Sequence, residues 1–293
     1  MALWRGPYQN GVSPETGLVS SWSREGQNLI WRRDFTGRST PIVFDGRVCA
    51  NGRAGEGILR QEVVACWDAE TGDQLWERRF TVYHTAVPWS RVGWANLAAD
   101  TETGNVYALN VDGELVALDK QGKTAWSWRL GQDFGRASGY GGRTTTPLVD
   151  EDRIILHVIG SGWGPTRGPA VDRTYAFDKR TGDVLWVSPG LPPDDMNTQS
   201  SPMVTLLEGR RVVLLGYSGG TVQALDVRTG APCGASGSRS GCSTAPWWSR
   251  ATGSSPATAR RTSTRPRWAA WWPSTAPAAA TSRRPKSSGA STS

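Results

Sequence analysis

Residues 63–76 read VVACWDAETGDQLW: a short apolar strand, an aspartate, a tight turn that ends in glycine, and a second strand that ends in tryptophan. The same order returns at 115–126 (LVALDKQGKTAW) and 175–186 (YAFDKRTGDVLW), and a fourth copy begins at 222–230 (VQALDVRTG). Each copy is typical of a β-hairpin, because a turn aspartate accepts hydrogen bonds from nearby backbone amides and glycine adopts the positive φ that closes the turn. The chain is therefore built from a repeated unit.

The aspartates and tryptophans of this unit keep a nearly constant spacing. The aspartates, 51, 59 and 48 residues apart, are Asp68, Asp119, Asp178 and Asp226. The tryptophans, which follow the first three aspartates by 8, 7 and 8 residues, are Trp76, Trp126 and Trp186. We expect the aspartates to hold turns rather than to catalyse, and the tryptophans to pack between neighbouring units. Contact of the tryptophans with a ligand is the alternative.

A second signal precedes three of the hairpins. A Ser/Thr-Ser/Thr-Pro motif followed by apolar residues stands at 39–43, 145–149 and 200–204, and a further apolar run follows each copy. Proline is tolerated at the start of a strand, and four strands in about 45–60 residues make a propeller blade. The second unit departs from this pattern, because it has WANL at 94–97. We predict an all-β fold, an incomplete β-propeller of the PQQ-like or WD40-like type. It comprises residues 1–231, with about four four-stranded blades and a leading strand at 28–31.

The charge of the chain lies mostly in its last residues. The formal net charge is +7, but residues 232–293 contain nine basic and no acidic residues, which leaves −2 for the rest. The body thus gives no electrostatic reason to expect a nucleic-acid partner. No apolar run reaches the roughly 20 residues of a membrane helix, and the chain as given begins without a signal peptide.

Residues 232–293 form an aberrant tail. They contain no Val, Leu, Ile, Phe or Tyr, so they bury too little apolar surface to offset the entropy of ordering, and we expect disorder. We also predict a shifted reading frame. Leu-Trp-Arg, which the repeat requires after residue 232, can be written CTG TGG CGC, and the same bases read one position later give Cys233-Gly234-Ala235. A genuine basic tail is the alternative.

The four cysteines suggest neither a disulfide framework nor a metal site. Cys233 and Cys242 lie in the tail, which leaves Cys49 and Cys66 in the repeats. With no C-x-x-C motif or Cys/His cluster, we expect these two residues to be small buried side chains on strands.

The hairpin motif resembles the pyrroloquinoline-quinone-type propeller repeat of quinoprotein dehydrogenases and of the outer-membrane assembly factor BamB. The motifs at 4–7 (WRGP), 11–13 (GVS), 91–94 (RVGW) and 138–144 (SGYGGRT) bring the chain closer to BamB-like proteins of planctomycete-type bacteria. This resemblance implies a non-enzymatic scaffold or binding protein in the periplasm or cell envelope. A quinone-dependent oxidoreductase is the alternative.

The candidate contacts with a ligand or partner lie in two polar connections between predicted blades. The first contains His84 and Arg91, and the second, which is rich in glycine, contains Arg136, Tyr140 and Arg143. Such connections lie beside the central channel of a propeller, where ligands bind. We therefore expect a protein, a peptide or a small acidic ligand there, although polar connectors without a ligand are the alternative.

The sequence offers no catalytic, cofactor-binding or metal-binding residues, so we expect no cofactor. In particular, we expect no use of pyrroloquinoline quinone. Quinoprotein dehydrogenases hold that cofactor beside Ca²⁺, often against a disulfide between adjacent cysteines, and this chain has no adjacent cysteine pair. A hard cation also needs several converging oxygen ligands, whereas the repeat aspartates are predicted to hold separate turns.

Overall fold

The computed structural model describes residues 3–6, 9, 11–83, 87–134, 144–158, 172–190, 200–217 and 221–236. The chain divides into two units, Met1–Trp248 and Ser249–Ser293, and all described residues belong to the first. In this part of the chain, no helix has the length and apolar character needed to span a lipid bilayer.

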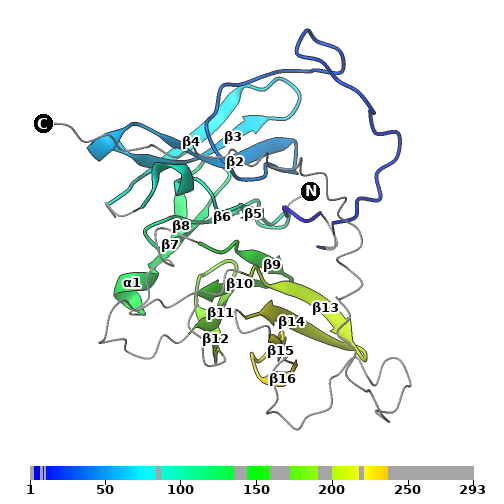
Figure 1. Ribbon diagram of the computed structural model, residues 1–293, viewed down its shortest axis with the longest axis vertical. Coiled ribbons are helices and arrows are strands. Elements are labelled where there is room, and N and C mark those ends of the chain that lie inside the picture. Colours follow the sequence, from blue (N-terminus) through cyan, green and yellow to red (C-terminus); the bar gives the residue numbers. More distant parts are fainter. Residues whose placement is uncertain are drawn as a thin grey trace, which may run out of the picture. The chain divides into compact units, whose positions relative to one another are not determined.

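Four antiparallel sheets of four strands confirm the predicted propeller fold (Figure 1). Each sheet is one blade, and its strands pair in chain order from first to fourth. The strands of blades 1 and 2 are β1 (Ile42–Phe44), β2 (Arg47–Ala54), β3 (Gln61–Asp68), β4 (Gln74–Thr81), β5 (Ala98–Ala99), β6 (Val106–Leu109), β7 (Glu114–Leu118) and β8 (Thr124–Arg129). Those of blades 3 and 4 are β9 (Leu148–Asp150), β10 (Arg153–Val158), β11 (Arg173–Asp178), β12 (Val184–Pro189), β13 (Met203–Leu207), β14 (Arg210–Gly216), β15 (Val222–Asp226) and β16 (Pro232–Ser236).

The repeat aspartates cap the turn between the third and fourth strands of each blade. Asp68 Oδ1 accepts hydrogen bonds from the backbone N–H groups of Glu70 and Thr71, both at 2.9 Å. These bonds stabilise the ionised carboxylate and hold the pKa of Asp68 below its ordinary value. Equivalent backbone bonds are accepted by Asp119, Asp178 and Asp226.

The repeat tryptophans lie on the turn glycine of the next blade. A Cβ atom added to Gly182 would lie 2.7 Å from the Trp126 ring, and one added to Gly230 would lie 2.4 Å from the ring of Trp186. Trp76 lies in the same way on Gly122, at 2.8 Å. We call this arrangement the docking contact. It needs glycine because a larger side chain would occupy the place of the ring.

The indole N–H completes the docking contact where the turn is long enough. Trp126 Nε1 donates to the carbonyl of Lys179, and Trp186 Nε1 donates to that of Val227, in each case three residues before the turn glycine. The turn of blade 2 is one residue shorter, and Trp76 Nε1 is buried with no hydrogen-bond partner among the described residues.

Three hydrophobic clusters join consecutive blades. One combines Trp76 of blade 1 with Val116 of blade 2, the next combines Trp126 of blade 2 with Phe177 of blade 3, and the third combines Trp186 of blade 3 with Val213 of blade 4. The core thus lies between sheets, and each interface contains the tryptophan of the preceding blade.

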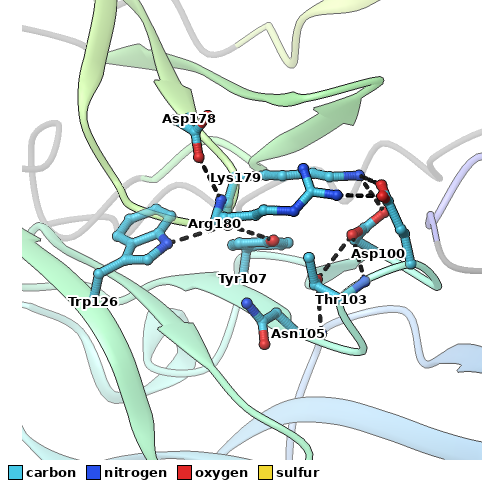
Figure 2. Close-up of polar contacts among 9 residues, drawn as sticks. Asp100, Thr103, Asn105, Tyr107, Trp126, Asp178, Lys179 and Arg180 are labelled. Atoms are coloured by element: carbon cyan, nitrogen blue, oxygen red, sulfur yellow. Dashed lines mark hydrogen bonds and ion pairs between the residues drawn. The ribbon is translucent and has the colours of Figure 1, made fainter.

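Polar groups reinforce the interface between blades 2 and 3 (Figure 2). The Lys179 carbonyl accepts hydrogen bonds from both the Tyr107 hydroxyl, at 2.9 Å, and Trp126 Nε1, at 3.2 Å. The Lys179 ammonium binds Asp100 at 3.0 Å and Glu102 at 2.6 Å. Burial acts to lower the pKa of Lys179, but these two carboxylates outweigh it and raise the pKa.

The fourth blade continues past the predicted boundary at residue 231. Strand β16 pairs with β15, and its Gly234 lies opposite Ala224. The equivalent position of blade 3 is occupied by Trp186, which lies opposite Ala176. The predicted Leu-Trp-Arg would thus put tryptophan at the docking register. The expected disorder is therefore wrong for residues 232–236, which form β16. Residues 237–293 lie outside the described residues, so their disorder and the shifted frame stay predictions.

The prediction that Cys49 and Cys66 are small buried side chains on strands is confirmed, but the sequence analysis missed the disulfide that joins them. The two residues are directly opposite on β2 and β3, and both are fully buried beside Trp76. Sequence spacing could not reveal the bond, since the pairing register of β2 and β3 brings the two side chains together.

Two glycine substitutions test the docking contact. Gly182 and Gly209 both have a left-handed backbone, with φ of +79° and +77°, but an added Cβ meets the Trp126 ring only at Gly182 and nothing within 4 Å at Gly209. Both alanine variants carry the roughly 1–2 kcal/mol cost of a left-handed non-glycine residue. We expect Gly182→Ala to lose about 1–3 kcal/mol more, from overpacking, in urea unfolding. Equal losses in the two variants would contradict the contact.

Candidate functional site

The connections between blades gather at one end of the sheets. The connections 82–97 and 130–147 run from the fourth strand of one blade to the first strand of the next. The links 55–60 and 110–113, between the second and third strands, reach the same end, because strands in each antiparallel blade alternate in direction. We call this end the loop face. It also carries the short helices η1 (Gly57–Leu59), η2 (Trp89–Arg91) and α1 (Leu130–Asp133).

The connection 82–97 is a packed segment whose described residues are fixed to blades 1 and 2. Its Val87 and Val92 are buried in a small cluster with Val111 of blade 2. From blade 1, Arg53 Nη1 donates to the carbonyl of Trp89 at 3.2 Å, and its guanidinium lies 5.1 Å from the Trp89 ring centroid. Such contacts give the loop face a defined surface.

A carboxylate is buried beneath this connection. The side chain of Glu62 is 1% exposed and accepts hydrogen bonds from Asn51 Nδ2, at 2.8 Å, and from the backbone N–H of Val111, at 2.7 Å. Burial raises the pKa of Glu62 to about 7; the bonds from Asn51, Val111 and Gly93 oppose the rise, and the charge of Asp112 adds to it. Glu62 therefore links both blades and the connection through a proton-sensitive group.

Blade 3 places a related polar pair at the same register. His157 lies on β10, four residues after Arg153, and Asp172 lies six residues before Asp178, the partner of Arg153. Asn51 and Glu62 have the same offsets from Arg47 and Asp68, the equivalent pair of blade 1. Both side chains are buried, His157 Nε2 lies 3.8 Å from Asp172 Oδ2, and His157 Nδ1 is 3.1 Å from the hydroxyl of Thr174.

The hydroxyl two residues before the motif proline joins each connection to the second strand of its blade. Ser39 Oγ donates to the carbonyl of Asn51 at 2.7 Å and accepts its backbone N–H at 2.9 Å. Ser200 makes the same pair of bonds with Gly216. Thr145 donates to the carbonyl of His157 at 2.5 Å. The motif found in the sequence thus fixes the inner ends of blades 1, 3 and 4.

In blade 2, where the motif is missing, an asparagine joins the neighbouring blades. Asn96 Oδ1 accepts the backbone N–H of Thr40 in blade 1, at 2.7 Å, and its Nδ2 donates to the hydroxyl of Thr146 in blade 3, at 3.3 Å. All three residues stand two positions before the first strand of their blade. The departure from the repeat thus supplies a bridge between blades.

A polar groove lies beside connection 82–97. Its volume is about 640 Å³, and it runs between β4 of blade 1 and the start of β7 and end of β8 in blade 2. Arg78, Arg129 and Asp112 supply charge, and Tyr83 is 78% exposed at its edge. Neither Arg78 nor Arg129 forms an ion pair with a described carboxylate. The groove therefore offers a partner an exposed aromatic ring and two guanidinium groups that have no carboxylate partner among the described residues.

One of the five predicted contacts falls within the described part of the chain. Arg91 ends η2 on the loop face and is half-buried. The other four, His84, Arg136, Tyr140 and Arg143, lie outside the described residues, so their role at a ligand site stays a prediction.

Sequence reasoning missed Asn51 and Glu62. A signal existed, because Glu62 shares its strand face with the buried Val64 and Cys66, and a carboxylate on an apolar face indicates a specific partner. In the described ranges, no three His, Cys, Asp or Glu side chains come together in a group suited to a metal ion.

Comparisons with known proteins place these features in a family. The family model described as "Outer membrane protein assembly factor BamB" matches residues 60–236. The chain is similar to a polyvinylalcohol dehydrogenase of a Pseudomonas species, with 24% identity over 264 residues that cover 73% of this chain and 41% of that protein. The chain thus spans less than half of the length of this relative.

Two solved structures are also similar to the chain. A quinohemoprotein alcohol dehydrogenase from Pseudomonas putida HK5 is 18% identical, with a TM-score of 0.49, over 71% of this chain and 35% of that one. BamB from Moraxella catarrhalis is 19% identical, with a TM-score of 0.44, over 68% of this chain and 48% of that one.

The buried carboxyl predicts a pH-dependent stability. Because the pKa of Glu62 is raised from 4.5 to about 7, the native protein holds a proton between these values that the unfolded chain has released. Stability then falls as the pH rises through this window, by about 3 kcal/mol. We expect urea unfolding from pH 4.5 to 8 to show this decline, and Glu62→Gln to abolish it.

The exposed Glu25 provides the control for this prediction. Glu25→Gln should keep the decline of the parent protein. If Glu62→Gln and the parent lose stability in parallel across the window, Glu62 is not the group that titrates.

Proposed function

The chain belongs to the family of the outer membrane protein assembly factor BamB, and on this premise we propose that it is a non-enzymatic propeller scaffold that binds a protein or peptide in the bacterial cell envelope. The observation that carries the proposal is the polar groove beside connection 82–97, with Arg78, Arg129 and Tyr83 open to a partner. Aromatic and arginine side chains contribute most of the binding energy in protein interfaces.

Two further features support this function. The loop face is held by hydrogen bonds to the second strands and by Arg53 and Arg60, which bind the carbonyls of Trp89 and Val87. A surface fixed before binding loses less entropy when a partner docks. The disulfide between Cys49 and Cys66 suits an oxidising compartment such as the periplasm.

Site-specific photo-crosslinking tests the binding function. A photoreactive phenylalanine analogue at Tyr83 should give one recurrent adduct in a bacterial envelope extract, because this residue lies at the groove. The same analogue at Leu206, which is 66% exposed in blade 4, should not give that adduct. Arg78→Glu together with Arg129→Glu should weaken the adduct roughly tenfold or more, since each lost charged hydrogen bond contributes about 1.5–3 kcal/mol. Identical adducts from Tyr83 and Leu206 would contradict the proposal.

A quinone-dependent oxidoreductase is the second candidate, because the chain resembles an enzyme named polyvinylalcohol dehydrogenase. Titration with pyrroloquinoline quinone and Ca²⁺ separates the two functions. We expect neither micromolar binding nor quinone-dependent dye reduction with an alcohol. Both results together would favour the oxidoreductase.

A further inference from the structure

The segment 28–35, which precedes blade 1, repeats the docking contact. A Cβ atom added to Gly72 would lie 2.6 Å from the Trp31 ring, as at the glycines of blades 2, 3 and 4. Trp31 Nε1 donates to the carbonyl of Ala69 at 2.8 Å, again three residues before the turn glycine. Trp31 therefore stands where the fourth strand of a blade preceding blade 1 would place its tryptophan.

Segment 28–35 belongs to no sheet among the described residues. None of the four sheets includes residues 28–35, and Ile30 is 81% exposed. The segment is nevertheless fixed to blade 1, since Arg33 donates to the carbonyl of Gly72 at 2.5 Å and binds Asp73 at 3.2 Å. The segment is thus held against the turn of blade 1 without pairing to any strand of the described structure.

A hollow of about 240 Å³ lies between this segment and blade 1, lined by Trp31, Val48, Ala50 and Trp67 among others. The pairing register identifies what belongs there. Val48 stands opposite Trp67 on β2 and β3, as Val213 stands opposite Leu225 on β14 and β15.

In blade 4, those equivalent residues pack against the face of the preceding blade. Val213 and Leu225 share a cluster with Leu148, Ile155 and Ala176 of blade 3. The hollow at blade 1 therefore lies at the register where a preceding blade would pack, beside the Phe35 ring, which meets Trp67 edge-on at 4.9 Å.

Blade 4 presents a face of this kind. In blade 3, one row of directly opposite residues crosses the four strands from first to fourth: Leu148, Ile155, Ala176 and Trp186. In blade 4 the same positions are Met203–Leu214–Ala224–Gly234. Met203 and Leu214 are half-exposed. This face has the apolar residues of a blade interface but lacks its tryptophan.

We propose that blade 4 of one molecule docks in the hollow at blade 1 of a second copy of this chain. Segment 28–35 of the second copy adds to β15 in place of β16, which puts its Trp31 opposite Ala224. Each end supplies what the other lacks: blade 1 carries the tryptophan of segment 28–35, which belongs to no sheet, and blade 4 carries a sheet without a tryptophan. The displaced β16 is a weak competitor, because Pro232 has no amide to donate and Gly234 has no side chain to pack.

The association is head-to-tail. The two surfaces that meet, on blade 4 and on blade 1, are different. An assembly of several copies therefore has an unoccupied blade 4 at one end and an unoccupied blade 1 at the other, unless it closes into a ring. The interface reproduces the contact already made three times within the chain, and it covers an open strand edge and an apolar face that otherwise favour association.

Disulfide trapping between two different molecules tests the pairing. By the register of blade 3, in which Ser188 stands opposite Thr174, Arg33 of one copy comes opposite Val222 of the other. In a background with Cys233→Ser and Cys242→Ser, a tagged Arg33→Cys chain is mixed with an untagged Val222→Cys chain and oxidised. We expect a mixed disulfide between the two chains, and light scattering of the parent protein at twice the monomer mass or more.

Two controls make the test specific. Arg24→Cys, exposed in the same N-terminal segment, should give no mixed disulfide with Val222→Cys. Trp31→Ala should weaken association roughly tenfold or more, whereas Trp22→Ala, at a side chain that is 70% exposed, should leave it unchanged. A monomer without the mixed disulfide overturns the proposal. So does a disulfide that forms only when both cysteines are in one chain.

Discussion

The contact of an indole ring with a glycine on the next blade sets the geometry of this protein. The ring needs the space that a side chain would fill, so each turn must carry glycine at one position, and the aspartate four residues earlier, or three in blade 2, shapes the turn that presents it. The hydrophobic clusters form around these rings, one between each pair of consecutive blades. A blade without its tryptophan therefore lacks the main anchor for its neighbour, and this is the condition of blade 4.

Fixing the blades in this way also fixes the loop face. The hydroxyl groups before the motif prolines bind the second strands, so the connections end at defined positions. The buried environment of the Glu62 side chain forms only when blades 1 and 2 pack together. Its carboxyl is desolvated by blade 1 and connection 82–97, and it accepts the backbone N–H of Val111 in blade 2. Stability and the shape of the candidate site are consequently linked through one titratable group.

The irregular features of the chain have the same physical origin. The shorter turn of blade 2 leaves the N–H of Trp76 without an acceptor in the described structure, yet the ring still docks, because burial of the indole does not require that hydrogen bond. Asn96 replaces the motif of the other blades and binds both neighbours instead. At each end of the repeat only one side of a blade interface is present. Trp31 lies on the turn glycine of blade 1, and the apolar face of blade 4 has no tryptophan. The blade-to-blade contact thus accounts for the candidate association surface as well as for the fold.

The sequence by itself determined the fold class, the strands of the hairpins and the turn role of the aspartates, whereas residues 28–31, predicted as a leading strand, belong to no strand of the described structure. These features depend on local chemistry: short apolar runs, aspartate and glycine in turns, and a fixed spacing. Only the tertiary structure decided the rest. The disulfide between Cys49 and Cys66 depends on the register of two strands, and β16 depends on backbone bonds that any non-proline residue can make. Asn51 and Glu62 became a site only when residues 49 positions apart in the chain, Glu62 and Val111, came within hydrogen-bonding distance. Such contacts between distant segments leave no local pattern, because each segment is compatible with many partners until the blades pack.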